Sequence, residues 1–109
     1  MALSIKPYIE NKETIHLIGI GGVSMNSLAE LLLSKGVPVT GSDRLGTDVT
    51  ARLEARGAKI SYEHKAENVQ GASLVVRTAA VHDDNPEVVR AHELGIPVME
   101  RAEAWGHLM

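Results

Sequence analysis

The chain has 109 residues, a net charge of −3 and an ordinary globular composition, with 44% hydrophobic and 23% charged residues. This length supports one domain and excludes a nucleotide-binding domain followed by a separate catalytic domain. The charge, without any cluster of Lys and Arg, excludes a typical nucleic-acid-binding surface. The absence of cysteine excludes disulfides, thiolate metal sites and a cysteine nucleophile. No apolar run approaches the roughly 18 residues of a membrane span, and the N-terminus lacks a signal-peptide pattern.

Short apolar runs alternate with amphipathic segments along the chain, without an internal repeat. The apolar runs predict five strands, over residues 15–20, 37–43, 58–64, 73–81 and 96–101. The fourth strand is expected to end near Thr78. Because strands that alternate with helices form βαβ units, we expect an α/β fold with a Rossmann-like, doubly wound, mostly parallel five-stranded sheet and helices on both faces.

The segments between these strands predict helices. The expected helices cover residues 24–36, 47–57, 84–95 and 102–109, and a short helix or turn covers residues 65–72. The inner side of the first helix is expected to carry Leu28, Ala29, Leu31 and Leu32. Because the last predicted helix continues to the final residue, we expect the chain to be a fragment of a longer protein.

The ends of the predicted helices carry specific residues. A glycine is expected just past the last turn of each of the first three, at Gly36, Gly57 and Gly95. Thr47 or Asp48 is the expected N-cap of the second helix, and Asn85, followed by Pro86, that of the third.

A glycine-rich stretch joins the first strand to the first helix. Gly19, Gly21 and Gly22 are followed by Ser24, where the dinucleotide fingerprint G-x-G-x-x-G has its third glycine. Gly19 is expected to form the turn, and Gly21 to let a diphosphate approach the backbone. The first N–H groups of the helix would then bind phosphate oxygens without a lysine. The alternative is that these glycines only build a tight turn.

An acidic residue, Asp43, follows the second strand about 20 positions after the glycines. In dinucleotide sites a carboxylate at this place accepts hydrogen bonds from ribose hydroxyls. Asp43 therefore predicts a ligand of the nucleoside diphosphate type, with a turn or capping role as the alternative.

Metal-ligand spacing is not evident in the sequence. The five histidines do not cluster, and His16 and His92 are interpreted as structural. Asp83, Asp84 and Asn85 are interpreted as a loop and helix cap rather than as a cation site.

The landmarks of the chain, taken together and in order, resemble the N-terminal domain of the Mur ligases. They are HLIGIGGVSM, GSD, LEARGAKI and TAAVHDDNPEVVRAHELGIPVMERAE, and the resemblance covers residues 5–109. It implies a cytoplasmic bacterial enzyme that adds an amino acid to the peptidoglycan precursor. Such an enzyme has an N-terminal domain for the UDP-sugar, a central ATP-binding domain and a C-terminal domain. The landmarks are most similar to those of the ligases that join L-alanine to UDP-N-acetylmuramate.

The resemblance also implies how the work is divided between domains. ATP and Mg²⁺ would serve the full-length enzyme, and the family's G-K-T phosphate loop is absent from this sequence. Residues 1–109 are therefore expected to form the UDP-sugar-binding domain alone, with no cofactor and no ligase activity of its own. Its expected partners are UDP-N-acetylmuramate and the remaining domains in cis, with no nucleic acid and no membrane.

Substrate-binding residues are implied in three matching stretches, and no catalytic or metal-binding residue is implied. The implied residues are Gly19, Ile20, Gly21, Gly22, Val23, Ser24, Met25, Ser42, Asp43, Arg44, Thr78, Ala79 and Ala80. His64 and Asn85 lie in matching stretches without an assigned role, while Arg77 and Trp105 depart from the family pattern.

Other functions remain open at this stage. One is an NAD-binding oxidoreductase domain or a regulatory nucleotide-binding module, against which Ser24 and the missing catalytic domain argue. A second is the related ligase that joins a tripeptide to the same UDP-sugar, and a third is a domain that keeps the fold and binds nothing. Titration with UDP-N-acetylmuramate and with NAD separates the ligase from the oxidoreductase.

Overall fold

A computed structural model describes residues 4–108 as eleven elements in an α/β order. The strands are β1 (Ile15–Ile18), β2 (Val39–Ser42), β3 (Lys59–Ser61), β4 (Leu74–Arg77) and β5 (Val98–Glu100). The helices are α1 (Lys6–Glu10), α2 (Val23–Ser34), α3 (Asp48–Ala55), the 3-10 helix η1 (Ala66–Val69), α4 (Pro86–Glu93) and α5 (Arg101–Leu108). Within this described part of the chain, every helix is too short or too polar to cross a bilayer.

The five strands form one sheet in the order β3-β2-β1-β4-β5, and all four pairings are parallel. This confirms the predicted doubly wound sheet. The chain moves outward through β1, β2 and β3 and then crosses back to β4, beside β1. The carboxyl ends of β1 and β4 therefore flank the point where the strand order reverses, which is where ligands bind in open α/β sheets.

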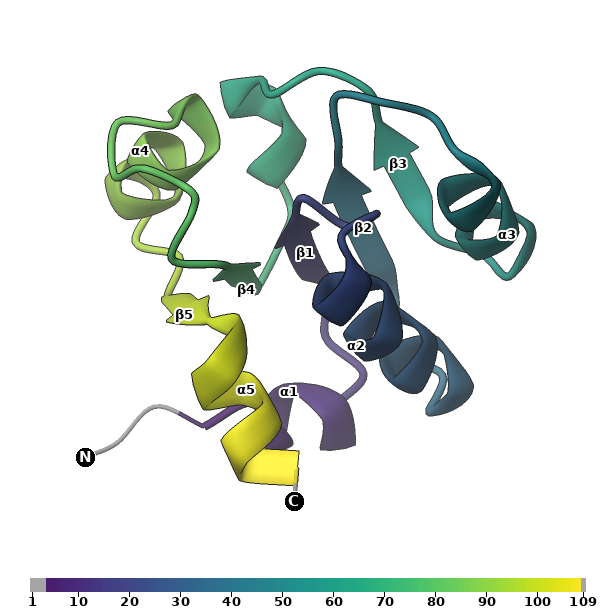
Figure 1. The fold of residues 1–109 in the computed structure, drawn as a ribbon. Helices are drawn as coiled ribbons and strands as arrows, with labels where there is room; N and C mark the ends of the chain where they lie inside the picture. The colour runs from purple at the N-terminus through teal and green to yellow at the C-terminus, as the bar shows by residue number, and fades with distance from the viewer. Residues whose placement is uncertain (1–3, 109) are drawn as a thin grey trace.

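Helices cover both faces of the sheet, but unequally (Figure 1). On one face, which we call the apolar face, α1, α2, α3 and α5 pack aliphatic side chains such as Leu28 and Leu32 against β1, β2 and β4. On the other, which we call the polar face, α4 and η1 cover a smaller apolar cluster with Val88 and Val69 at its centre. The polar face also carries the buried side chains of His16, Ser42 and Glu87.

The predicted helix ends are confirmed. Gly36, Gly57 and Gly95 follow the last residues of α2, α3 and α4 with φ of 78°, 113° and 73°. Thr47 is the N-cap of α3, where its hydroxyl accepts from the Thr50 N–H. Asn85 is the N-cap of α4 and accepts from the Glu87 N–H at 2.9 Å.

Three local expectations are corrected by the structure. Each strand is shorter than predicted; β1 stops at Ile18 because Gly19 turns away with φ of 77°. Met25 joins Leu28, Ala29 and Leu32 as a buried residue of α2, whereas Leu31 is only half-buried. Helix α1 was not expected at all. Five residues carry no periodic signal, and a helix this short needs tertiary contacts, here the fully buried Ile5 at its N-cap.

Candidate functional site

The glycine loop lies between β1 and α2, at the carboxyl edge of the sheet. The N–H groups of Gly19 and Ile20 donate to the Ser42 carbonyl at 2.8 and 3.0 Å, which ties the loop to β2. Gly22 is the N-cap of α2 and provides no side-chain cap for it. The first N–H groups of a helix have no partner within it, so the N–H groups at the start of α2 remain available to an anion.

Two cavities meet at this loop. The first, which we call the helix cavity, has a volume of about 330 Å³ and is lined by Ile18, Gly19, Gly22, Val23, Ser24, Met25, Thr78, Val81 and Arg101. It brings the start of α2 together with the end of β4. Arg101, the first residue of α5, adds a positive charge. This combination of helix N-terminus and guanidinium suits a phosphate group.

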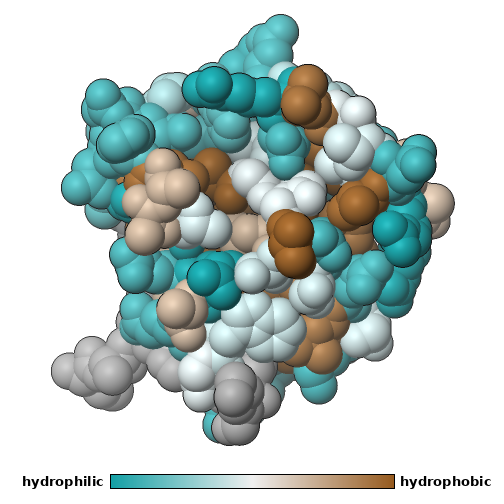
Figure 2. Space-filling model, viewed as in Figure 1, coloured by the Kyte–Doolittle hydropathy of each residue, from teal (hydrophilic) through white to brown (hydrophobic). Residues whose placement is uncertain are grey.

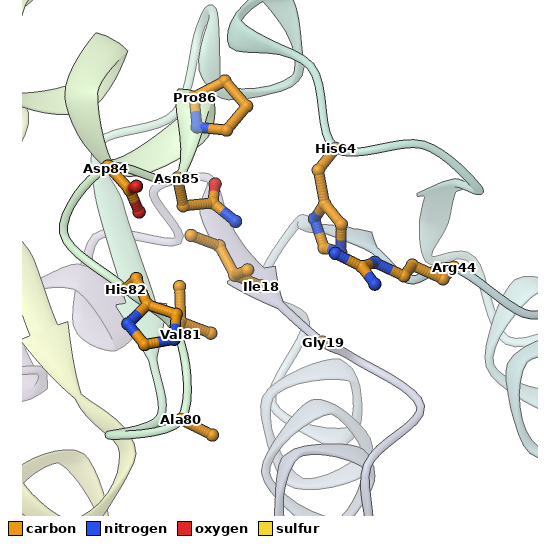
Figure 3. Close-up of a pocket in the computed structure, with 10 residues that line it drawn as sticks. All are labelled: Ile18, Gly19, Arg44, His64, Ala80, Val81, His82, Asp84, Asn85 and Pro86. Atoms are coloured by element: carbon orange, nitrogen blue, oxygen red, sulfur yellow. The ribbon is translucent and has the colours of Figure 1, made fainter.

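The second cavity, which we call the loop cavity, has a volume of about 640 Å³. Its lining residues are Ile18, Gly19, Arg44, His64, Ala80, Val81, His82, Asp84, Asn85 and Pro86. Figure 3 shows His64 and Arg44 on one side, the loop between β4 and α4 on the other, and Ile18 and Gly19 between them. Because Ile18, Gly19 and Val81 line both cavities, the two are adjacent. In the view of Figure 2, hydrophilic residues lie mainly around the outline of the molecule, while weakly polar and hydrophobic residues occupy its middle.

The structure brings most of the predicted site residues together. Gly19, Gly22, Val23, Ser24, Met25 and Thr78 line the helix cavity, and Arg44 and Ala80 line the loop cavity. Ile20, Gly21, Ser42, Asp43 and Ala79 line neither. Ile20 is fully buried, in space that Gly41 leaves open, since a Cβ on Gly41 would lie 2.6 Å from Ile20 Cδ1.

Asp43 contacts the glycine loop. Its Oδ2 accepts from the Gly21 N–H at 2.8 Å, and its Oδ1 accepts from the Leu45 N–H at 3.3 Å. A Cβ on Gly21 would lie 2.7 Å from Asp43 Oδ2 and 3.0 Å from the Thr50 methyl. Glycine is therefore needed here to admit the Asp43 carboxylate, whichever ligand binds.

A buried carboxylate lies behind the loop cavity. Glu87 is fully buried at the start of α4, and its side chain contacts residues from four other parts of the chain. Oε1 lies 2.5 Å from His16 Nε2 and 2.9 Å from Ser42 Oγ. Oε2 lies 3.1 Å from His64 Nδ1 and 3.2 Å from Asn68 Nδ2. Ser42 thus faces this cluster rather than either cavity.

The hydrogen bonds of Glu87 set its ionisation. Burial raises the pKa of the Glu87 carboxyl, but the hydrogen bond and charge interaction with His16 and the hydrogen bonds from Ser42 and Asn68 outweigh burial. The net effect lowers the pKa of Glu87 below its ordinary value, so the group is a carboxylate at neutral pH. Among the described residues, every buried side-chain nitrogen or oxygen has a hydrogen-bond partner.

The loop between β4 and α4, which forms one wall of the loop cavity, is held by Arg77. The guanidinium forms an ion pair with Asp83 and donates to the Val81 carbonyl. The hydrogen bond and charge of Arg77 hold the pKa of Asp83 below its usual range. Arg77 therefore fixes the conformation of this wall.

Several residues of the site were not assigned from the sequence. Arg101, His64, His82 and Asn85 line a cavity, and Glu87 lies directly behind one. A signal for Glu87 does exist: polar side chains at His16, Thr40 and Ser42 fall on one face of two paired, otherwise apolar strands. No group of three or more His, Asp or Glu side chains within residues 4–108 is arranged to hold a metal ion.

Comparison with known proteins identifies relatives over most of the chain. Residues 14–109 match the family model described as "Mur ligase family, catalytic domain". A UDP-N-acetylmuramate–L-alanine ligase from Clostridium novyi is 50% identical over 100 residues, which cover 92% of this chain and 22% of that protein. The chain thus spans about a fifth of the length of such relatives.

Solved structures agree with this result. A UDP-N-acetylmuramate-alanine ligase from Thermotoga maritima superposes with a TM-score of 0.78 at 41% identity, over 83% of this chain and 21% of that one. A UDP-N-acetylmuramate:L-alanyl-gamma-D-glutamyl-meso-diaminopimelate ligase from Neisseria meningitides gives a TM-score of 0.74 at 26% identity, over 82% and 28%. The sheet order, the glycine loop and these similarities lead to one conclusion: the chain belongs to the Mur ligase family, as its Rossmann-type N-terminal domain.

Proposed function

We propose that this chain binds UDP-N-acetylmuramate at the glycine loop, as the substrate-binding domain of an ATP-dependent ligase that joins L-alanine to that substrate in cytoplasmic peptidoglycan synthesis. The observation that carries the proposal is the helix cavity. It places the start of α2 and the Arg101 side chain at the point where the strand order reverses. That arrangement suits a diphosphate, and the relatives of similar sequence are ligases named for a UDP-sugar.

The two adjacent cavities divide the substrate between them. The diphosphate would lie against the N–H groups of Val23, Ser24 and Met25 in the helix cavity, and the uridine in the loop cavity. The residues that line the cavities offer backbone donors, cations and imidazoles, and we assign no catalytic step to them. ATP and Mg²⁺ would act in the remaining domains of the enzyme, and so this chain alone would have no ligase activity.

Isothermal titration calorimetry of the 109-residue chain tests the proposal. UDP-N-acetylmuramate and UDP are expected to bind, and NAD is not. Binding of NAD without a response to UDP would favour the oxidoreductase alternative instead. The choice between L-alanine and a tripeptide as the added group, raised by the similarity to the Neisseria ligase, is tested by assaying the whole enzyme with each.

A loop variant locates the site. Gly21→Val is expected to abolish UDP binding, because its Cβ would collide with Asp43 Oδ2 and displace the loop. Ser27→Ala, on an exposed position one turn into α2, is the matched control and is expected to bind UDP like the wild type. If Gly21→Val binds UDP as tightly as the wild type does, the UDP site does not lie at the glycine loop.

A further inference from the structure

The buried cluster around Glu87 has a defined direction of hydrogen bonding. An ionised carboxylate only accepts hydrogen bonds, so each of its four neighbours must donate to it. His16 donates through Nε2–H, and its Nδ1 lies 2.7 Å from the Thr40 hydroxyl. Ser42 donates its hydroxyl proton to Glu87 Oε1, and Asn68 donates its amide to Oε2.

The same direction determines the tautomer of His64. Its Nδ1 lies 3.1 Å from Glu87 Oε2 and 3.2 Å from Ser42 Oγ, whose own proton is directed at Glu87. Both neighbours therefore present lone pairs, and Nδ1 must carry the proton. In the neutral imidazole Nε2 is then an acceptor. The side chain is 20% exposed and lines the loop cavity, and Nε2 has no hydrogen-bond partner among the described residues.

Asn85 presents the opposite group in the same cavity. Its Oδ1 is used as the N-cap of α4, accepting from the Glu87 N–H. This bond orients the amide, so that the NH₂ group is the part left for a ligand. Figure 3 shows the Asn85 nitrogen turned toward the side of the cavity where His64 lies. The cavity thus offers one acceptor and one donor, each oriented through Glu87.

We propose that Glu87 is a positioning residue that locks His64 as the Nδ1–H tautomer, so that His64 Nε2 and the Asn85 amide together recognise the imide edge of uracil. This inference rests on the proposed function and deepens it. Uracil presents the N3–H donor beside a carbonyl acceptor, which complements an imidazole lone pair beside an amide NH₂. Cytosine has a lone pair at N3, which would face the lone pair of His64 Nε2. The site therefore selects UDP over CDP.

Competing titrations of the chain with UDP and CDP test this selection. We expect UDP to bind at least about tenfold more tightly, because the mismatched base leaves a polar group of the site without a partner. Equal affinities would overturn the inference while leaving the proposed function intact. Failure of both nucleotides and of UDP-N-acetylmuramate to bind would overturn both.

Nitrogen NMR of the imidazoles tests the positioning role directly, in the ligand-free chain. In the wild type, His64 is expected as the Nδ1–H tautomer. In Glu87→Gln, whose carboxamide can donate to Nδ1, the Nε2–H tautomer is expected to appear and the preference for UDP over CDP to fall toward one. The positioning role of Glu87 would be refuted if His64 is the Nε2–H tautomer in the wild type. It would also be refuted if a folded Glu87→Gln keeps the wild-type preference for UDP over CDP. Glu93→Gln, exposed on the same helix, is the control.

Asn85→Asp provides a test that does not disturb the buried cluster. Aspartate is as good an N-cap as asparagine, so the stability of α4 is expected to be retained. The variant removes the NH₂ donor and places a carboxylate against the uracil carbonyl, so UDP affinity is expected to fall by roughly tenfold or more. Wild-type affinity for UDP in Asn85→Asp would remove Asn85 from the recognition site and overturn the inference.

Discussion

The two faces of the sheet are stabilised in different ways. On the apolar face, four helices bury aliphatic side chains against β1, β2 and β4, and residues such as Leu17, Leu28 and Leu32 are fully buried. On the polar face, α4 and η1 cover a smaller apolar cluster, and beside it Glu87 binds His16, Ser42, His64 and Asn68. The apolar face depends on packing, whereas the polar face combines a smaller apolar cluster with a complete set of buried hydrogen bonds.

The comparison explains why the candidate site lies where it does. An apolar contact tolerates substitutions that keep its volume, whereas a buried carboxylate orients every group bonded to it. The Glu87 carboxylate holds His64, the backbone N–H of Glu87 holds Asn85, and both residues line the loop cavity. The polar face therefore contributes orientation to the site at its edge, while the apolar face holds the strands and α2 in place.

The largest effect on stability is expected on the polar face. Glu87→Leu should lower the free energy of unfolding by about 3–5 kcal/mol, because it leaves four buried or half-buried polar groups without their acceptor. Urea unfolding followed by circular dichroism measures this. A loss below about 1 kcal/mol would mean that water or a rearrangement satisfies the cluster, and that the two faces do not differ as we describe.

A cavity on the apolar face is expected to lower the free energy of unfolding somewhat less than Glu87→Leu does. Leu28→Ala removes a fully buried side chain between α2 and the sheet, and should lower the free energy of unfolding by about 3 kcal/mol. The same unfolding experiment at pH 5 and pH 7 should give the same loss, since no titrating group is involved. A loss that depends on pH would show that the two faces are coupled.

Acid is expected to weaken the polar face selectively. Because the pKa of Glu87 is lowered on folding, its ionisation stabilises the protein above the ordinary glutamate pKa of about 4.3. This contribution is lost as the pH falls through the folded-state value. In thermal melts between pH 6 and pH 3, the wild type should therefore lose more stability than Glu87→Gln. Parallel curves for the two proteins would contradict the assigned direction of the shift.

The smallest effect is expected at a local helix cap, which belongs to neither core. Thr47→Ala removes the hydroxyl that accepts from the Thr50 N–H, and should lower the free energy of unfolding by about 1 kcal/mol. Thr47→Ser keeps the acceptor and is the matched control. If both variants lose stability equally in chemical denaturation, the Thr47 methyl group rather than the cap is responsible.

The sequence by itself determined the parts of the structure that depend on neighbours along the chain. The alternation of apolar runs and amphipathic segments predicted the parallel sheet, because a strand buried on both faces needs a continuous apolar run. The glycines at positions 36, 57 and 95 predicted three helix ends, and the Asn85 cap followed from the residue types that accept from a first-turn N–H. Gly19 marked the turn of the loop for the same local reason.

Tertiary structure alone decided which distant side chains meet. His16 and Glu87 are 71 positions apart, so no short motif links them, and only the packing of α4 against the polar face of the sheet brings them into contact. Asp43 matched a ribose-binding pattern, yet where its carboxylate lies depends on the space that Gly21 leaves. Helix α1 begins beside Ile5, which is fully buried in the cluster of the apolar face, and this burial is a tertiary contact. The local sequence determines which backbone conformation each segment prefers. Which polar side chains meet depends instead on how the segments pack in the whole fold.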